Sequence, residues 1–140
     1  KDRMRDIFGA PSDGMSISVM SFAFKTGLPR EADLVLDVRF LANPHYDPKL
    51  RPLSGLDKEV GKVVSSDKDF ASYIDSIKAM LTLTVPRFER EGKSHLTIAV
   101  GCTGGRHRSV FITETLASWL GGLQNHSIHR HHRDLVKKSG

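Results

Sequence analysis

The feature that most constrains the fold is a short apolar segment that runs straight into a glycine-rich turn and then into a helical pattern. Residues 95–100 (HLTIAV) predict a buried strand, residues 101–105 hold three glycines, and residues 109–120 have the apolar spacing of a helix. A further short strand is expected at residues 124–130. Strand, turn, helix and strand in this order form a βαβ unit, which implies a parallel sheet covered by helices.

Two more strands are expected before this unit. Residues 15–24 alternate apolar and polar side chains, and residues 33–41 are nearly continuously apolar. Residues 42–56 then show no period and contain three prolines, so a long loop without regular structure is expected there. Such a loop within a small domain is unusual and, when ordered, is typically functional.

A long helix is expected after this loop. Ser66 or Asp67 offers an N-cap, and apolar residues recur at helical spacing from Phe70 to Phe88. Pro86 is expected to kink or shorten the helix near its end. The predicted fold class is therefore α/β: a small, mostly parallel sheet flanked by helices, with a glycine-rich anion-binding loop between a strand and a helix.

Length and composition indicate one domain. The chain has 140 residues, 39% of them hydrophobic and 26% charged, which predicts a single domain over residues 1–140. Its start at Lys1, without an initiator methionine, predicts a fragment of a longer protein. The single cysteine, Cys102, fits a reducing compartment, and no apolar run approaches the roughly 18 residues of a membrane-spanning helix. We therefore expect a protein of a reducing compartment without a membrane partner.

The segment 101–109 (GCTGGRHRS) is the strongest functional signal. Its glycines allow successive backbone N–H groups to turn toward one point, the following helix adds partial positive charge, and Arg108 adds a bidentate fork. These groups favour phosphate or a similar oxyanion as ligand. The alternative is a structural turn that merely needs its glycines, but this would not explain Thr103, Arg106, Arg108 and Ser109 in the same segment.

Two phosphate-loop patterns bear on whether the segment predicts an enzyme. The nucleoside-triphosphate loop G-x-x-x-x-G-K-[ST] is absent, so the sequence encodes no NTPase active site of that kind. Cys102, Arg108 and Ser109 match the C-x5-R-[ST] loop of cysteine-dependent phosphatases, whose general acid would here be Asp47. The pattern is short and arises often by chance. We therefore predict a non-enzymatic domain without catalytic residues, with the phosphatase as the rival hypothesis.

Residues 43–51 (NPHYDPKLR) form a second candidate segment. Because it follows the carboxyl end of another expected strand, it would face the glycine-rich segment across the edge of the sheet. The two segments would then surround a phosphorylated sugar, with Asp37, His45 or Asp47 on its hydroxyl or amino groups. Arg39 is either a cation of this pocket or an ion-pair partner near Asp37. The alternative for the whole segment is an ordinary surface turn.

Positive charge is concentrated at the C-terminus. The net charge is +5, and residues 125–140 hold two arginines and two lysines against one aspartate. Such a segment favours RNA or DNA as partner, because bound cations release counterions from the phosphate backbone; the alternative is a solvated tail. His129 and His131 would share a strand face, but no Cys or Glu cluster completes a metal site. No metal or other cofactor is expected.

Two long blocks carry a family resemblance. Residues 27–57 (GLPREADLVLDVRFLANPHYDPKLRPLSGLD) and 98–110 (IAVGCTGGRHRSV) resemble the C-terminal domain of the RapZ/YvcJ family of bacterial proteins. The resemblance implies that an N-terminal P-loop kinase-like domain precedes this one. It also implies a cytoplasmic adapter that binds small regulatory RNA, brings it to an endoribonuclease, senses glucosamine-6-phosphate and forms dimers through this domain.

The resemblance also implies site residues. Matching positions place the metabolite pocket at His45, Thr103, Gly104 and Arg108, lined further by Arg39 and Arg51. With the rest of the glycine-rich loop, the expected ligand-binding residues are His45, Arg39, Arg51, Cys102, Thr103, Gly104, Gly105, Arg108 and Ser109. The expected RNA-binding residues are Arg133, Lys137, Lys138, Arg130 and His107.

The C-terminal segment departs from the family pattern. Asp134, Val136 and Ser139 dilute its basic run, which weakens the RNA hypothesis more than the sugar-phosphate hypothesis. Two alternatives stay open: a nucleotide sugar in place of glucosamine-6-phosphate, and a pure dimerisation module.

Overall fold

The computed structural model describes residues 14–123 and 126–135 and contains one sheet of four parallel strands. The strands are β1 (Ser16–Ala23), β2 (Leu34–Asp37), β3 (His95–Cys102) and β4 (Ser127–His132). Their order in the sheet is β2-β3-β1-β4, and all carboxyl ends lie at one edge. The predicted α/β class with a parallel sheet is confirmed, although residues 124–125 of the expected last strand lie outside the described residues.

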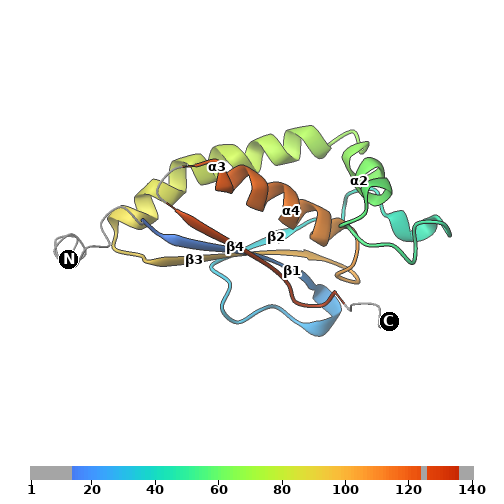
Figure 1. The fold of residues 1–140 in the computed structure, drawn as a ribbon, viewed down its shortest axis with the longest axis horizontal. Coiled ribbons are helices and arrows are strands. Elements are labelled where there is room, and N and C mark those ends of the chain that lie inside the picture. Colours follow the sequence, from blue (N-terminus) through green and yellow to red (C-terminus); the bar gives the residue numbers. More distant parts are fainter. Residues whose placement is uncertain (1–13, 124–125, 136–140) are drawn as a thin grey trace.

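Helices cover one face of this sheet (Figure 1). The helices of the described part of the chain are α2 (Lys58–Ser65), α3 (Phe70–Arg90) and α4 (Arg108–Gly121). Figure 1 shows α3 and α4 above the sheet, with the light-blue segment between β1 and β2 passing below it. The main core lies between helices and sheet, where in-register neighbours such as Ile17 and Leu96, or Val19 and Ile98, are fully buried.

The opposite face has a smaller core. Met20 and Phe22 of β1 and Ala99 of β3 are buried there, and Phe24 and Ala32 pack against them from the segment below the sheet. This segment returns the chain to the edge from which β2 starts.

The apolar segment 33–41 contains less strand than expected. Strand β2 ends at Asp37, and the carboxylate of Asp37 then accepts hydrogen bonds from the backbone and side chain of Arg39. Val38 and Leu41 are 0% and 2% exposed. Their apolar character thus reflects burial of the turn after the strand rather than continuation of the strand.

Helix α2 was not expected from the sequence. It buries Val60 and Val64, while Gly61 lies so close to α4 that a Cβ there would be 2.7 Å from the Phe111 ring. A single buried pair at i and i+4 is too weak a helical signal to detect beside the proline-rich loop. That loop is also less irregular than expected, because Pro44–Tyr46 form one turn of 3₁₀ helix capped by the side chain of Asn43.

Pro86 does not end α3, which continues to Arg90. Proline removes the hydrogen bond to the carbonyl four residues earlier, here that of Thr82. Both Pro86 and Thr82 lie on the exposed side of the helix, so water can satisfy that carbonyl. The expectation that Pro86 shortens the helix was therefore wrong.

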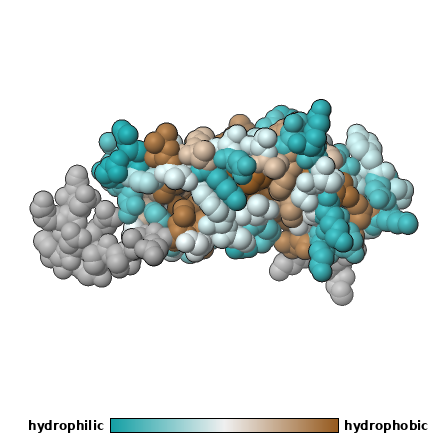
Figure 2. Space-filling model, turned by 90° about the horizontal axis from the view of Figure 1, so that it is seen from above, coloured by the Kyte–Doolittle hydropathy of each residue, from teal (hydrophilic) through white to brown (hydrophobic). Residues whose placement is uncertain are grey.

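The surface over the helices shows hydrophobic side chains in separate spots among polar ones (Figure 2). The most exposed of the large ones on α3 is Leu83, at 66%. Among the described residues, no helix is both long and apolar enough to cross a membrane.

Candidate functional site

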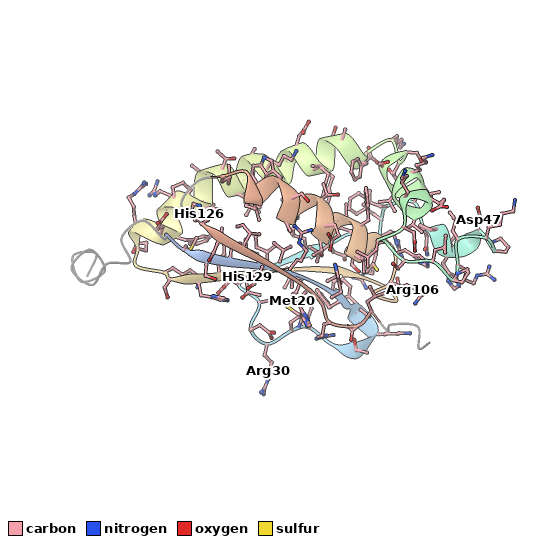
Figure 3. The ribbon with its side chains drawn as sticks, viewed as in Figure 1. Met20, Arg30, Asp47, Arg106, His126 and His129 are labelled. Atoms are coloured by element: carbon pink, nitrogen blue, oxygen red, sulfur yellow. The ribbon has the colours of Figure 1, made fainter. Side chains whose placement is uncertain are left out.

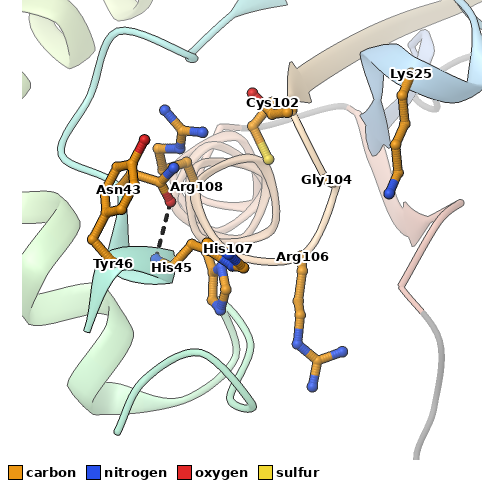
Figure 4. Close-up of a pocket in the computed structure, with 10 residues that line it drawn as sticks. Lys25, Asn43, His45, Tyr46, Cys102, Gly104, Arg106, His107 and Arg108 are labelled. Carbon is orange, nitrogen blue, oxygen red and sulfur yellow. Dashed lines mark hydrogen bonds between the residues drawn. The ribbon is translucent and has the colours of Figure 1, made fainter. Parts of the chain in front are cut away.

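A cavity of about 460 Å³ lies where the carboxyl ends of the strands meet. Three separate parts of the chain form it: the 3₁₀ turn Phe24–Thr26 after β1, the loop after β2, and the turn from β3 into α4 (Figure 4). Ten residues line it, namely Lys25, Asn43, His45, Tyr46, Cys102, Thr103, Gly104, Arg106, His107 and Arg108. These side chains include three cations and no carboxylate, so the cavity suits an anion.

The two predicted segments therefore meet at this cavity. Five of the expected ligand residues line it: His45, Cys102, Thr103, Gly104 and Arg108. Four others do not, namely Arg39, Arg51, Gly105 and Ser109. Three of these four, Arg39, Arg51 and Ser109, form hydrogen bonds within the protein.

Arg39 and Arg51 both form hydrogen bonds within β2 and the loop that follows it. Arg39 forms a two-pronged ion pair with Asp37, with distances of 2.7 to 3.1 Å, and its guanidinium lies 3.9 Å from the centre of the Phe24 ring. The hydrogen bonds from Arg39 hold the pKa of Asp37 below its usual value. Arg51 donates from Nε to the carbonyl of His45 at 2.8 Å. The structure thus favours the ion-pair interpretation of Arg39.

Arg108 is a buried cation at the first position of α4. It is 4% exposed, and its Nη1 donates to the carbonyls of Arg39 and Leu41. Its Nε is buried without a hydrogen-bond partner among the described residues. A guanidinium held in this way is fixed before a ligand arrives, which lowers the entropy cost of binding.

Arg106 and His107 connect the two loops of the site. Arg106 donates from its guanidinium to the carbonyls of Pro52 and Leu53, and its own carbonyl accepts the N–H of Gly55 at 2.9 Å. His107 is 6% exposed, with Nε2 at 3.2 Å from the carbonyl oxygens of Leu50 and Arg51. His107, expected to contact RNA, therefore lies between loops and supports the cavity wall.

Burial lowers the pKa of His107, with Arg106 adding to this effect, while the hydrogen bonds to backbone carbonyls oppose it. The folded protein thus releases the His107 proton at a lower pH than the unfolded chain does. We expect the free energy of unfolding to be highest above about pH 6.5 and to fall as the pH decreases from there toward the folded-state pKa. The slope from this one group is at most about 1.4 kcal/mol per pH unit.

Urea unfolding of the protein and of His107→Asn between pH 4 and 8 measures this contribution. The stability difference between the two proteins should shrink as the pH falls below about 6.5. A difference that is independent of pH would show that His107 does not titrate differently in the folded state.

Cys102 and Asp47 do not face one another in the cavity. Cys102 is 2% exposed and its Sγ donates to Ser109 Oγ at 3.0 Å. Asp47 accepts the N–H of Lys49 and is absent from the cavity lining; Figure 3 shows it at the outer end of its loop. The described lining offers no other carboxyl group to protonate a leaving oxygen, which disfavours the phosphatase hypothesis.

The expected RNA-binding arginines pair with groups of the domain itself. Arg130 forms an ion pair with Glu114 of α4, and Arg133 donates to Thr26 Oγ1 at 2.8 Å and to the carbonyl of Gly27 at 2.7 Å. Lys137 and Lys138 lie outside the described residues. Within residues 14–123 and 126–135, no group of three or more metal-ligating side chains is placed to hold a metal ion.

The sequence did not point to Lys25 at all. Asn43, Tyr46 and Arg106 lie in the two segments that were expected to surround the ligand, but they were not among the expected ligand-binding residues. Lys25 follows the carboxyl end of β1, and all carboxyl ends of a parallel sheet share one edge. That rule, applied to every expected strand, would have found Lys25. Arg106 lies within the predicted loop, but nothing in the sequence shows which way its side chain points.

Comparison with known proteins gives one family. A family model described as the RapZ C-terminal domain matches residues 15–136. Among similar curated proteins, a nucleotide-binding protein of Rhodospirillum rubrum is 60% identical over 86% of this chain and 38% of its own length. Nucleotide-binding proteins of Paramagnetospirillum magneticum and Bacillus thuringiensis are 54% and 48% identical, over 94% and 89% of this chain and 43% and 42% of theirs. The chain thus spans less than half the length of these relatives.

Proposed function

Because this chain belongs to the RapZ C-terminal domain family, we propose that it is a non-enzymatic regulatory domain that binds a phosphorylated amino sugar, glucosamine-6-phosphate, in the cavity at the strand ends. We also propose that the domain binds RNA as a second ligand and forms a dimer. The longer protein to which it belongs would be cytoplasmic and would deliver RNA to an endoribonuclease. A nucleotide sugar is the alternative small ligand.

The observation that supports the proposal most directly is the set of groups around the cavity. Arg108 is buried and fixed, the turn Thr103–His107 leads into the N-terminus of α4, and the described lining has no carboxylate. Backbone N–H groups at a helix N-terminus and a guanidinium together favour a phosphate dianion. His45, Asn43 and Tyr46 offer polar atoms on the other side of the cavity for hydroxyl or amino groups.

Isothermal titration calorimetry with glucosamine-6-phosphate tests the proposal. We expect binding of glucosamine-6-phosphate, weaker binding of glucose-6-phosphate, and no binding of glucosamine, which lacks the phosphate. Absence of heat with all three would contradict the proposal. Release of inorganic phosphate during the titration, abolished by Cys102→Ser, would instead favour a cysteine-dependent phosphatase.

RNA binding is supported by charge. The net charge is +5, and the exposed side of the cavity carries Lys25 and Arg106. With Arg130 and Arg133 paired inside the domain, we infer that RNA contacts these cavity cations and the lysines after residue 135. One anion site used by both ligands would let the sugar phosphate displace RNA.

RNA affinity is expected to fall steeply with salt. Each phosphate contact contributes a slope of about −0.7 to the plot of log affinity against log salt concentration. Fluorescence anisotropy with a labelled small RNA between 50 and 300 mM salt should give a slope steeper than −2, and glucosamine-6-phosphate should raise the RNA dissociation constant. A flat salt response would contradict RNA binding, and a tight dimer in sedimentation without either ligand would favour a pure dimerisation module.

A further inference from the structure

We propose that the anion site continues past Gly104 into a second subsite, where Lys25 and Arg106, in front of the Arg133–Asp134 ion pair, take the second phosphate group of a doubly phosphorylated sugar. The inference rests on the proposed function, because the first phosphate occupies the cavity beside Thr103 and Arg108. It adds doubly phosphorylated sugars to the expected ligands, whereas the proposed function includes only sugars with one phosphate.

Two neighbouring cavities carry this inference. The cavity already described, of about 460 Å³, shares Lys25, Gly104 and Arg106 with a second one of about 410 Å³. The second cavity extends toward the end of β1 and the residues after β4. Gly104 lies at the junction, and a Cβ built on it would have no atom within 4 Å. The two cavities therefore adjoin at this residue, and no side chain stands between them there.

The second cavity is rich in positive charge. Lys25 is exposed, and Figure 4 shows its side chain on the opposite side of Gly104 from Tyr46. None of the ion pairs among the described residues involves Lys25. Arg106 is held by the carbonyls of Pro52 and Leu53, which fixes its charge at the border of both cavities.

Arg133 and Asp134 line the second cavity and are absent from the lining of the first. The Nη2 of Arg133 donates to Thr26 and Gly27, while Asp134 Oδ2 accepts from Arg133, from the N–H of Ala23 at 2.8 Å and from Thr26 Oγ1 at 2.9 Å. Burial tends to raise the pKa of Asp134, but these hydrogen bonds outweigh it and lower the pKa. Asp134 is thus ionised and balances one of the three cations. Two positive charges remain, which match a phosphate dianion.

Calorimetry with two probes that differ by one phosphate tests the subsite: glucosamine-6-phosphate and the 1,6-bisphosphate of the same sugar. The measured quantity is the ratio of their dissociation constants. In the unmodified chain we expect the bisphosphate to bind about tenfold more tightly, as one charge-assisted hydrogen bond would give. Lys25→Gln should bring the ratio close to one.

Arg30→Gln is the matched control. Arg30 is exposed on the segment below the sheet, pointing away from the cavities (Figure 3), and its replacement removes the same single charge. We expect this variant to keep the tenfold ratio. Arg133 is unsuitable as a test position because it holds the backbone at Thr26 and Gly27.

Three results would overturn the inference. Equal affinities for the two sugars in the unmodified chain would reject the second subsite and leave the proposed function intact. A ratio lowered equally by Lys25→Gln and Arg30→Gln would reveal a general charge effect without a subsite. Failure of both sugars to bind would reject the proposed function, and the subsite with it.

Discussion

Arg108→Ala is expected to weaken the binding of glucosamine-6-phosphate by roughly 10- to 150-fold, which corresponds to the loss of about 1.5–3 kcal/mol in charge-assisted hydrogen bonds. Arg108 is the buried cation of the cavity and is already fixed by the carbonyls of Arg39 and Leu41. No other side chain in the cavity lining combines a full positive charge with such burial. Calorimetry on both proteins measures the change.

The same substitution is expected to lower stability, because two carbonyls after β2 lose their donor. Each buried group left without a hydrogen bond costs about 1–3 kcal/mol. Urea unfolding in the absence of ligand measures this loss of stability separately from the loss of affinity. A second variant, Arg108→Lys, keeps the positive charge but loses the bidentate fork. Unchanged affinity in a folded Arg108→Ala protein would exclude Arg108 from the phosphate site.

Gly55→Ala is expected to destabilise the fold by about 3 kcal/mol, the upper end of the usual cost of forcing extra atoms into a packed interior. A Cβ at Gly55 would lie 2.4 Å from both the carbonyl oxygen of His107 and the amide nitrogen of Phe111. These two atoms form a 3.0 Å hydrogen bond in the first turn of α4. The methyl group would strike backbone atoms, which cannot rotate away, so loop and helix must separate.

Gly121→Ala is the matched control for this glycine substitution. A Cβ at Gly121, at the end of α4, would have no atom within 4 Å. Alanine there should leave stability unchanged or raise it by up to about 1 kcal/mol, because alanine is the better helix former. Urea unfolding of the two variants compares them directly, and equal stabilities would contradict the close approach at Gly55.

The sequence predicted best the unit from β3 to α4, whose residues follow one another along the chain. The unit from β3 through the glycine-rich turn to α4 has its apolar strand, its glycines and its helical spacing next to one another, so local signals were sufficient. The order of the strands could not be predicted, because no local sequence pattern shows that β3 lies between β2 and β1. Helix α2 and the early end of β2 were missed because burial by other elements, rather than local periodicity, determines them.

The site was predictable in outline only. That residues 43–51 meet the glycine-rich turn follows from the shared edge of a parallel sheet. The contacts that hold the two loops together could not be foreseen, since Arg106 and its acceptor Leu53 are 53 positions apart. The same holds for Arg133, whose basic side chain suggested RNA and whose actual acceptors, Thr26 and Gly27, come from the start of the chain.

The attachment of Asp134 to Ala23 and Thr26 has a practical consequence for protein engineering. It fixes the last described residues at the rim that holds the proposed ligand cavities, whereas β1 begins at the opposite rim. A purification tag or fluorescent fusion joined directly to Leu135, which lines the second cavity, would therefore start beside this cavity and compete with ligands for the same space. Fusions intended for binding measurements belong at the rim where β1 begins, and a dye attached at Leu135 would sense occupancy directly.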